Sequence, residues 1–256
     1  MDTVIQAFQN RIIAMLEELG RIFILLYDTI RLIFHKPYGF RDIMKQMLEV
    51  GNRSLPVVLI TAGFTGAVLA LQSYTGFKRF NAESLVGTVV ALSMTRELGP
   101  VLTSLMVAGR AGSAMAAELG TMRVTEQIDA LVTLATNPVK YLVVPRFLAG
   151  LVMLPVLVLL SDAIGIVGGY IVGVNMLGIN PVTYKLATFN FLEVGDIMSG
   201  LMKAAFFGVS ISIISCYKGF YAGGGAEGVG KATTGAVVIS SMTILISDYF
   251  LTSMLF

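Results

Sequence analysis

The sequence contains little of the chemistry on which most enzymes and metalloproteins depend. Of its 256 residues one is cysteine, Cys216, one is histidine, His35, and none is tryptophan. A single cysteine excludes a disulfide within the chain, and a single histidine argues against a histidine-based metal site. No serine has a recognisable base nearby in the sequence, so a nucleophilic catalytic set is not expected.

Charged side chains are also scarce. They make up 13% of the chain, hydrophobic residues make up 55%, and the mean hydropathy is +0.81. A water-soluble protein of this length cannot bury so much apolar surface, so the composition predicts an integral membrane protein. The apolar segments are about 20 residues or longer and do not alternate with polar residues, which indicates an all-α protein and not a barrel.

Three common sequence signatures are missing. Met1 is followed by the acidic Asp2 and an amphipathic pattern, so no signal peptide is predicted. The glycine-rich stretch 218–231 resembles a phosphate-binding loop, but Lys231 is followed by Ala232 and the GxxxxGK[ST] pattern is not met, so we expect no ATP binding by this chain. No internal repeat is recognisable, which argues against an inverted-repeat secondary transporter.

The first 50 residues are amphipathic at helical spacing. Their densest apolar run, residues 22–34, is too short to cross a hydrocarbon core of about 30 Å. We therefore expect an N-terminal helix that lies in the membrane interface, with a weakly hydrophobic spanning helix as the alternative. A turn is expected at residues 36–39, before a second amphipathic piece.

A transmembrane domain over residues 51–256 follows, with five predicted spans. They cover residues 56–76, 84–117, 147–177, 197–217 and 232–256. Polar loops are expected at 180–196 and 218–231, and a short helix at about 122–135 with Thr125 as its N-cap. Arg and Lys cluster before Pro56 and between Arg110 and Arg146, so the positive-inside rule places these segments and the N-terminus in the cytoplasm and the C-terminus outside.

Two adjacent charges, Arg96 and Glu97, lie near the middle of the second predicted span. A charge at this depth costs at least a few kcal/mol, so both side chains should face protein, water or a ligand. One interpretation is a structural ion pair. We prefer a polar anchor in a cavity, where Arg96 binds a phosphate through two hydrogen bonds, because adjacent helical residues point about 100° apart. Pro100 cannot donate to the carbonyl of Arg96, which favours a bend there.

Three further charges interrupt the predicted spans. Lys203 either joins the same cavity or extends to the outer headgroups. Asp162 and Asp248 either relay protons or make packing contacts, and the sequence does not separate these alternatives.

Small residues recur every four positions in two spans. The first stripe is Ala62, Gly66 and Ala70, and the second is Ala108, Gly112, Ala116 and Gly120. Such stripes allow close contact between helices. For the second stripe we favour packing within one chain over a seam between two chains.

The segment 124–131 is short, acidic and amphipathic. Ile128 and Leu131 share one helical face, with Glu126 and Asp129 beside them. Such a helix is suited to docking in a groove of a soluble partner, although many surface segments share the pattern.

The stretch RELGPVLTSLMVAGRAGSAMAAELGTMRVTEQIDAL at 96–131, followed by NPVKYLVVPR and GAEGVGKATTGAVV, closely resembles the MlaE (YrbE-type) permease family. The resemblance covers most of residues 51–256. It implies a homodimeric transmembrane subunit of an ABC transporter that moves phospholipids between the inner and outer membranes. ATP and Mg would be bound by a cytoplasmic ATPase partner, and an MCE-domain ring and in some systems a STAS-domain protein would complete the assembly.

The resemblance also implies roles for particular residues. Arg96 and Glu97 match a pair that lines the lipid cavity, and Lys203 matches a basic residue there. The coupling helix that docks in the ATPase would contain Glu126, Gln127, Ile128, Asp129, Ala130 and Leu131. We expect no cofactor, metal or nucleic acid on this chain.

Two other classes of function stay open from the residues alone. One is an ion-coupled transporter that uses Arg96, Glu97 and Asp162. The other is an intramembrane lipid-modifying enzyme or protease, which lacks a catalytic set in this sequence. Binding of an ATPase partner would distinguish an ABC transporter permease from both of these alternatives.

Overall fold

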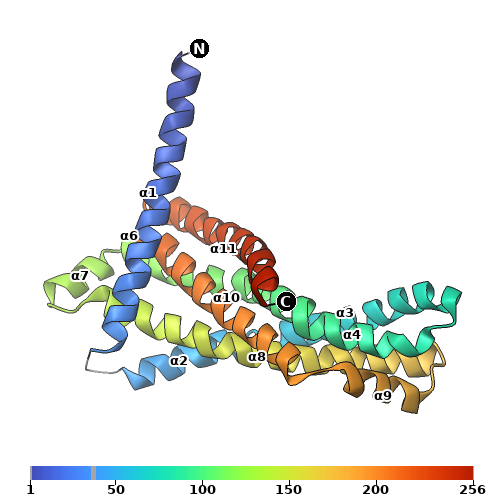
Figure 1. Cartoon of the computed structure of the whole chain (residues 1–256). Helices are drawn as coiled ribbons and strands as arrows, with labels where there is room; N and C mark the ends of the chain where they lie inside the picture. The colour runs from blue at the N-terminus through green and yellow to red at the C-terminus, as the bar shows by residue number, and fades with distance from the viewer. Residues whose placement is uncertain (1, 36–38, 256) are drawn as a thin grey trace.

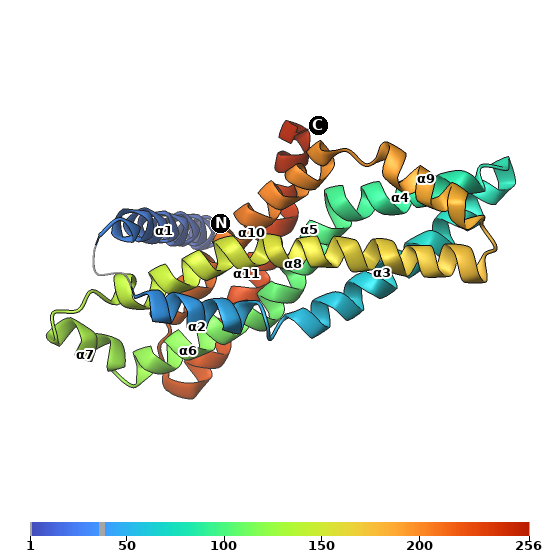
Figure 2. The same cartoon turned by 90° about the horizontal axis from the view of Figure 1, so that it is seen from below.

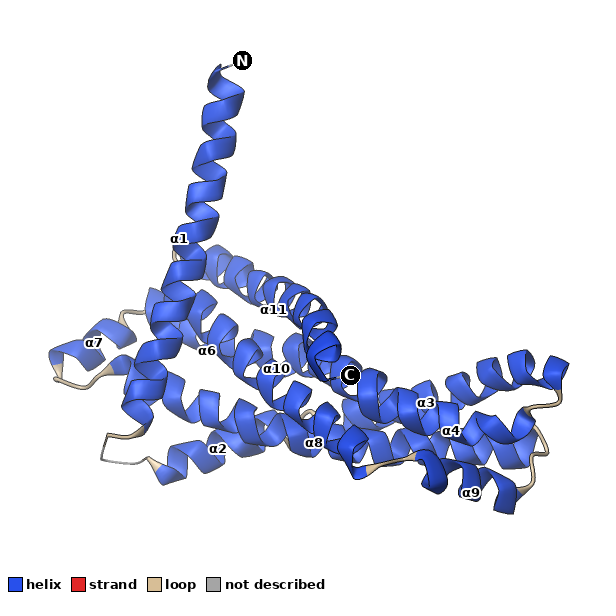
Figure 3. Ribbon diagram, in the orientation of Figure 1, coloured by secondary structure: helices blue, strands red, loops and turns tan. Residues whose placement is uncertain are grey.

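The computed structural model describes residues 2–35 and 39–255, and the secondary structure within these ranges is helical throughout (Figures 1 and 3). The α-helices are α1 (Asp2–Ile33), α2 (Phe40–Val50), α3 (Leu55–Phe77), α4 (Val86–Ser93), α5 (Gly99–Val107), α6 (Ser113–Val124), α7 (Gln127–Thr133), α8 (Val144–Ile171), α9 (Pro181–Phe191), α10 (Val194–Phe220) and α11 (Gly225–Leu255). The all-α prediction is confirmed. The turn expected at 36–39 lies largely outside the described residues.

Short non-α turns join or interrupt these helices. Two 3-10 turns, η1 (Lys78–Phe80) and η2 (Glu83–Leu85), connect α3 to α4. Four π-helical turns are η3 (Met94–Leu98), η4 (Ala108–Gly112), η5 (Val139–Val143) and η6 (Val172–Met176). Because η3 and η4 are inserted between α4, α5 and α6, these three helices form one interrupted rod.

Five helical stretches in the described part of the chain are long and apolar enough to cross a membrane, in agreement with the five predicted spans. They are Phe40–Phe80, Glu83–Val124, Val139–Met176, Val194–Phe220 and Gly225–Leu255. Most of these helices extend past the predicted limits. Hydropathy shows where a helix is apolar, whereas helical backbone hydrogen bonding continues into polar sequence. The chain is a multi-pass membrane protein.

Two segments that were predicted as polar loops are largely helical. In the segment 180–196, the Asn180 side chain accepts hydrogen bonds from two backbone N–H groups and starts α9. One face of α9 is buried against α4, where Tyr184 and Thr188 lie one turn apart. In the segment 218–231, only residues 221–224 lie outside helices. Both predictions were wrong because tertiary contact stabilises helices that composition alone disfavours.

Helix α1 lies across the long helices instead of along them (Figures 1 and 2). Its C-terminal half packs on the bundle through Leu25 and Thr29, which are buried, while Phe23 and Tyr27 are exposed. Its N-terminal half projects beyond the rest of the molecule (Figure 1). The predicted helix is confirmed, and its direction across the bundle fits a segment that lies in a membrane interface.

Helices approach each other closely at both predicted small-residue stripes. Ala62, Gly66 and Ala70 are buried, and a methyl group placed on Gly66 would lie 1.8 Å from the carbonyl oxygen of Gly165 in α8. In the second stripe, a methyl group on Gly112 would lie 2.9 Å from the Ser215 hydroxyl oxygen of α10. The second stripe therefore packs within this chain, as predicted.

Candidate functional site

The site is built on the π-helical turn η3, which carries Arg96 and Glu97. π-turns within α-helices are frequent at functional sites because they displace side chains from the regular helical path. Pro100, the second residue of α5, has no N–H, so it cannot supply the donor that the carbonyl of Arg96 would have in a regular α-helix. Lys203 of α10 fills this gap, with its Nζ donating to the Arg96 carbonyl at 3.0 Å. The proline that disrupts the helix thus creates an attachment point for a second helix.

Lys203 is fully buried, with 0% of its side chain exposed, and it is the centre of a charged cluster. Its Nζ lies 2.9 Å from Glu97 Oε2 and 3.1 Å from Asp248 Oδ1 of α11. It also donates to the hydroxyl oxygen of Thr252 at 2.7 Å, and this hydroxyl lies 3.1 Å from Glu97 Oε1. The interpretation of Lys203 as a lysine that extends to the headgroups is wrong, because two carboxylates and the Arg96 carbonyl hold it inside the bundle.

Arg96 also pairs with α10, seven residues before Lys203, at Asp196. Its Nε donates to Asp196 Oδ1 at 2.7 Å, and its Nη2 lies 2.6 Å from the same oxygen. Asp196 is the third residue of α10, where its other oxygen accepts the backbone N–H of Glu193 as part of a capping box. Arg96 and Glu97 thus each form an ion pair with a residue of α10, Arg96 with Asp196 and Glu97 with Lys203.

Sequence reasoning did not select Asp196 or Thr252. The acidic residues Glu193 and Asp196 have the spacing of a capping box, which could have placed the start of α10 near 194. Nothing in the local sequence indicates that Asp196 faces Arg96, which is 100 residues away in the chain.

The cluster holds three carboxylates and two cations, so it has no surplus positive charge. The carboxylates belong to Glu97, Asp196 and Asp248, and the cations to Arg96 and Lys203. Arg96 and Glu97 are the members that reach the surface most, with 39% and 38% of their side chains exposed. A bound molecule would therefore meet Arg96 and Glu97 first, while Lys203 and Asp196 hold them in place.

Two glycines allow the helices around η3 to meet. A methyl group on Gly200 of α10 would lie 2.2 Å from the carbonyl oxygen of Thr95, so only glycine lets α10 approach η3 at this depth. A methyl group on Gly99 would lie 1.7 Å from Asp162 Oδ1 of α8. Within the described part of the chain Asp162 makes no ion pair, and it packs behind η3 without joining the cluster.

One residue of η3, Leu98, also lines an apolar groove on α3. It has a volume of about 470 Å³ and is lined by Thr61, Phe64, Thr65, Val68, Leu69, Gln72 and Leu98. Leu98 directly follows Glu97 in η3. The turn η3 thus carries two charged residues and one residue of an apolar groove, and an amphiphile needs surfaces of both kinds.

The predicted docking segment forms the short helix α7 at one end of the bundle (Figures 1 and 2). Thr125 is not its N-cap, because the Thr125 hydroxyl donates to the carbonyl of Thr121 and ends α6. Glu126 makes the reversal between α6 and α7, with a φ of +60°. This sharp turn needs a residue with a left-handed backbone conformation, and the residue types that mark an N-cap do not reveal it.

The two faces of α7 differ in what they contact. Ile128 is buried in a cluster that includes Leu119 and Tyr217 of the same chain, and Leu131 is half-buried against it. Asp129 pairs with Arg123 at 2.6 Å. Glu126, Gln127 and Ala130 are exposed. The face of α7 with Ile128 and Leu131 therefore holds it to its own chain, and the exposed remainder, which includes Gln127, Ala130 and Val132, is open to a partner.

No group of three or more His, Cys, Asp or Glu side chains in the described ranges is arranged to hold a metal ion.

Comparison with known proteins gives one consistent family. Residues 43–254 match the family model described as Permease MlaE. A probable ABC transporter permease protein of Rickettsia bellii is 56% identical over 247 residues, covering 96% of this chain and 95% of the relative. The intermembrane phospholipid transport system permease protein MlaE of Haemophilus influenzae is 39% identical over 256 residues, covering 98% and 97%. The chloroplastic protein TRIGALACTOSYLDIACYLGLYCEROL 1 of Arabidopsis thaliana is 41% identical over 217 residues, covering 85% and 62%.

Proposed function

The chain belongs to the MlaE permease family, and on that premise we propose that it moves phospholipids between the inner and outer membranes as the transmembrane subunit of an ABC transporter. It is a permease and not an enzyme, as its relatives are named. The observation that carries the lipid assignment is the partly exposed Arg96 and Glu97 on η3, where Lys203 holds Glu97 and the next residue, Leu98, lines an apolar groove.

Each part of a phospholipid has a complementary surface at this site. The guanidinium of Arg96 presents planar N–H donors that suit a phosphate, and it exchanges part of its bonding to Asp196 for the headgroup. The groove beside Leu98 receives acyl chain surface. Lys203 does not touch the lipid directly in this arrangement. It fixes the position of Glu97 from inside the bundle through their ion pair.

The energy source is a partner. We propose that two copies of the chain form a homodimer, that a cytoplasmic ATPase binds ATP and Mg and docks on α7, and that an MCE-domain ring binds on the periplasmic side. A STAS-domain protein is a further candidate partner. The N-terminus lies in the cytoplasm and the C-terminus in the periplasm, because basic residues concentrate before Pro56 and between Arg110 and Arg146.

Replacing Arg96 by glutamine is expected to lower the rate of ATP-driven lipid transfer between about 10- and 100-fold. This range corresponds to the free energy of a hydrogen bond to a charged group, about 1.5–3 kcal/mol. Transfer is measured with the assembled complex in proteoliposomes. Because R96Q leaves Asp196 buried without its cation, the double variant R96Q/D196N serves as the folded control, and it should assemble normally yet transfer poorly. Wild-type transfer by the double variant would rule out a headgroup role for Arg96.

Introducing arginine at Ala130, on the exposed face of α7, is expected to weaken ATPase binding at least 10-fold and leave the permease folded. Replacing the buried Ile128 by alanine should instead lower the melting temperature, since this side chain packs in its own chain. ATPase binding is measured by pull-down from detergent. Thr183→Arg, at an exposed position of α9 at the opposite end of the bundle, is the matched control. Unchanged binding of A130R would show that the ATPase docks elsewhere.

A further inference from the structure

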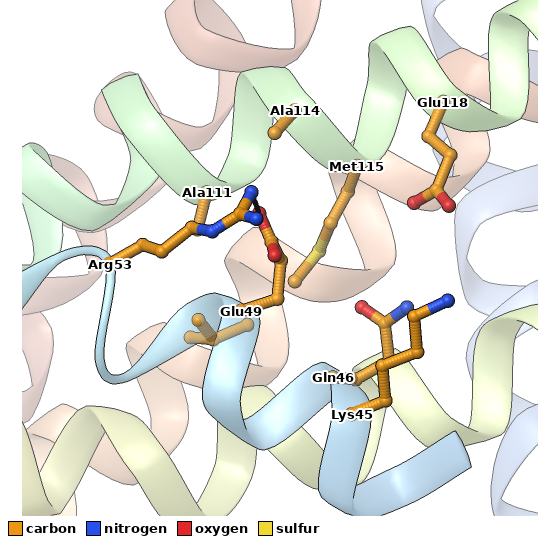
Figure 4. Close-up of a pocket in the computed structure, with 9 residues that line it drawn as sticks. Lys45, Gln46, Glu49, Arg53, Ala111, Ala114, Met115 and Glu118 are labelled. Atoms are coloured by element: carbon orange, nitrogen blue, oxygen red, sulfur yellow. Dashed lines mark hydrogen bonds and ion pairs between the residues drawn. The ribbon is translucent and has the colours of Figure 1, made fainter.

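A polar cavity lies between α2 and α6, and none of its lining residues belongs to the Lys203 cluster (Figure 4). Its volume is about 290 Å³. Lys45, Gln46 and Glu49 of α2 and Arg53 of the following turn form one side, and Glu118 of α6 stands on the other. The remaining lining is apolar and comprises Val50, Ala111, Ala114 and Met115.

Both carboxylates that line this cavity already have arginine partners. Glu49 accepts from Arg53 at 2.6 Å and from Arg110 at 3.1 Å. Glu118 lies 2.6 Å from Arg146, whose side chain is only 4% exposed. Three guanidinium groups thus neutralise two carboxylates, so this region keeps a surplus positive charge even before Lys45 is counted.

Lys45 adds a further positive charge to the lining. Within the described residues its ammonium makes no ion pair, and neither it nor the Gln46 amide makes a hydrogen bond. Both side chains extend from α2 toward the space in front of Glu118 (Figure 4). The cavity therefore has, within the described residues, hydrogen-bond donors without partners and a net positive charge beside apolar lining residues. In the Lys203 cluster, by contrast, carboxylates outnumber cations.

The cavity lies at the end of an apolar span. Arg53 precedes α3, which has no charged residue from Leu55 to Phe77. With the orientation proposed above, this position is the cytoplasmic headgroup level of the membrane. Basic pockets between spanning helices on this side are suited to anionic lipid headgroups.

We propose that the cavity between α2 and α6 binds the phosphate of an anionic phospholipid of the cytoplasmic leaflet. Lys45 and Gln46 donate to the phosphate oxygens, Arg53 contributes the N–H groups that Glu49 does not use, and Met115 contacts the glycerol portion. The location in the cytoplasmic leaflet rests on the proposed orientation, whereas the phosphate chemistry rests only on the charges and contacts. A lipid bound here would join α2 to α6, the helix that leads directly into α7.

The test measures binding without transport. The full chain is purified in detergent in the R96Q/D196N background, which removes the Arg96 site, and is titrated with dioctanoyl phosphatidylglycerol, dioctanoyl phosphatidylcholine or inorganic phosphate. We expect phosphatidylglycerol to bind at least 10-fold more tightly than phosphatidylcholine. K45Q should weaken this binding about 10-fold and A114L, which fills the cavity without changing charge, should weaken it as well. K78Q, which alters a lysine of η1 at the other end of the bundle, should leave it unchanged.

Each result decides the proposal. Equal binding of the two lipids, or binding that K45Q and A114L leave intact, would overturn it. Binding of inorganic phosphate as tight as that of phosphatidylglycerol would support the phosphate site and overturn the lipid as its source. Loss of ATPase capture by K45Q without loss of lipid binding would identify the cavity as a protein contact and overturn the proposal. Because no transport is measured, failure of the proposed lipid transfer would leave this result unaffected.

Discussion

Replacing Lys203 by methionine is expected to destabilise the permease by about 3–5 kcal/mol and to abolish lipid transfer. The methionine fills similar space but leaves Glu97 and Asp248 without their shared cation and the Arg96 carbonyl without its donor. Such a loss is a large part of the stability of a typical domain. The thermal unfolding of the purified chain in detergent and transfer by the assembled complex measure the two effects.

A triple variant separates stability from function. K203M/E97Q/D248N removes the cation together with both carboxylates, and replacing a complete buried ion cluster by neutral groups is often close to neutral in free energy. We expect most of the lost stability to return and transfer to stay low, because Glu97 is then no longer charged or held. A K203M chain that melts at the wild-type temperature would mean that the ion cluster does not stabilise the fold.

Adding a single methyl group at Gly66 is expected to have the second large effect. The Gly66→Ala side chain would lie 1.8 Å from the Gly165 carbonyl oxygen, so α3 and α8 must separate. Overpacking of this kind costs about 1–3 kcal/mol and occasionally more. In a membrane, close packing of small residues is also a main source of helix association, so little else compensates. Thermal unfolding and the yield of assembled complex report the loss.

The same substitution at Gly76 is the matched control. Gly76 lies on the same helix, and no neighbouring atom lies within 4 Å of the position of a new methyl group. Gly76→Ala should leave the melting temperature unchanged or raise it, since alanine favours a helix over glycine by up to about 1 kcal/mol. Equal destabilisation by both substitutions would rule out the contact with α8 as the cause.

The two proposed sites of action lie on one continuous stretch of chain. η3 continues through α5, η4 and α6, and α7 follows α6 after the reversal at Glu126. A displacement of α7 by an ATPase would thus be passed along α6 toward Arg96 and Glu97. The π-turns at η3 and η4 are the places in this rod where the regular helical hydrogen bonding is already interrupted.

Composition and local spacing were sufficient for much of the architecture. Long apolar runs predicted five spans, and the four-residue recurrence of Ala62, Gly66 and Ala70 predicted where helices approach closely. Pro100 predicted an irregularity in the second span, and the π-turn η3 lies there. These features follow from sequence because each depends on residues within a few helical turns.

The tertiary structure alone decided how the charges are paired. Arg96 meets Asp196 across 100 residues of sequence and Lys203 meets the Arg96 carbonyl across 107, and Asp248 and Thr252 come from a third helix. The burial of Ile128 in its own chain and the helicity of α9 likewise depend on what packs against them. Hydropathy and periodicity describe one helix at a time, whereas a buried ion pair depends on the rotation and depth of two helices together.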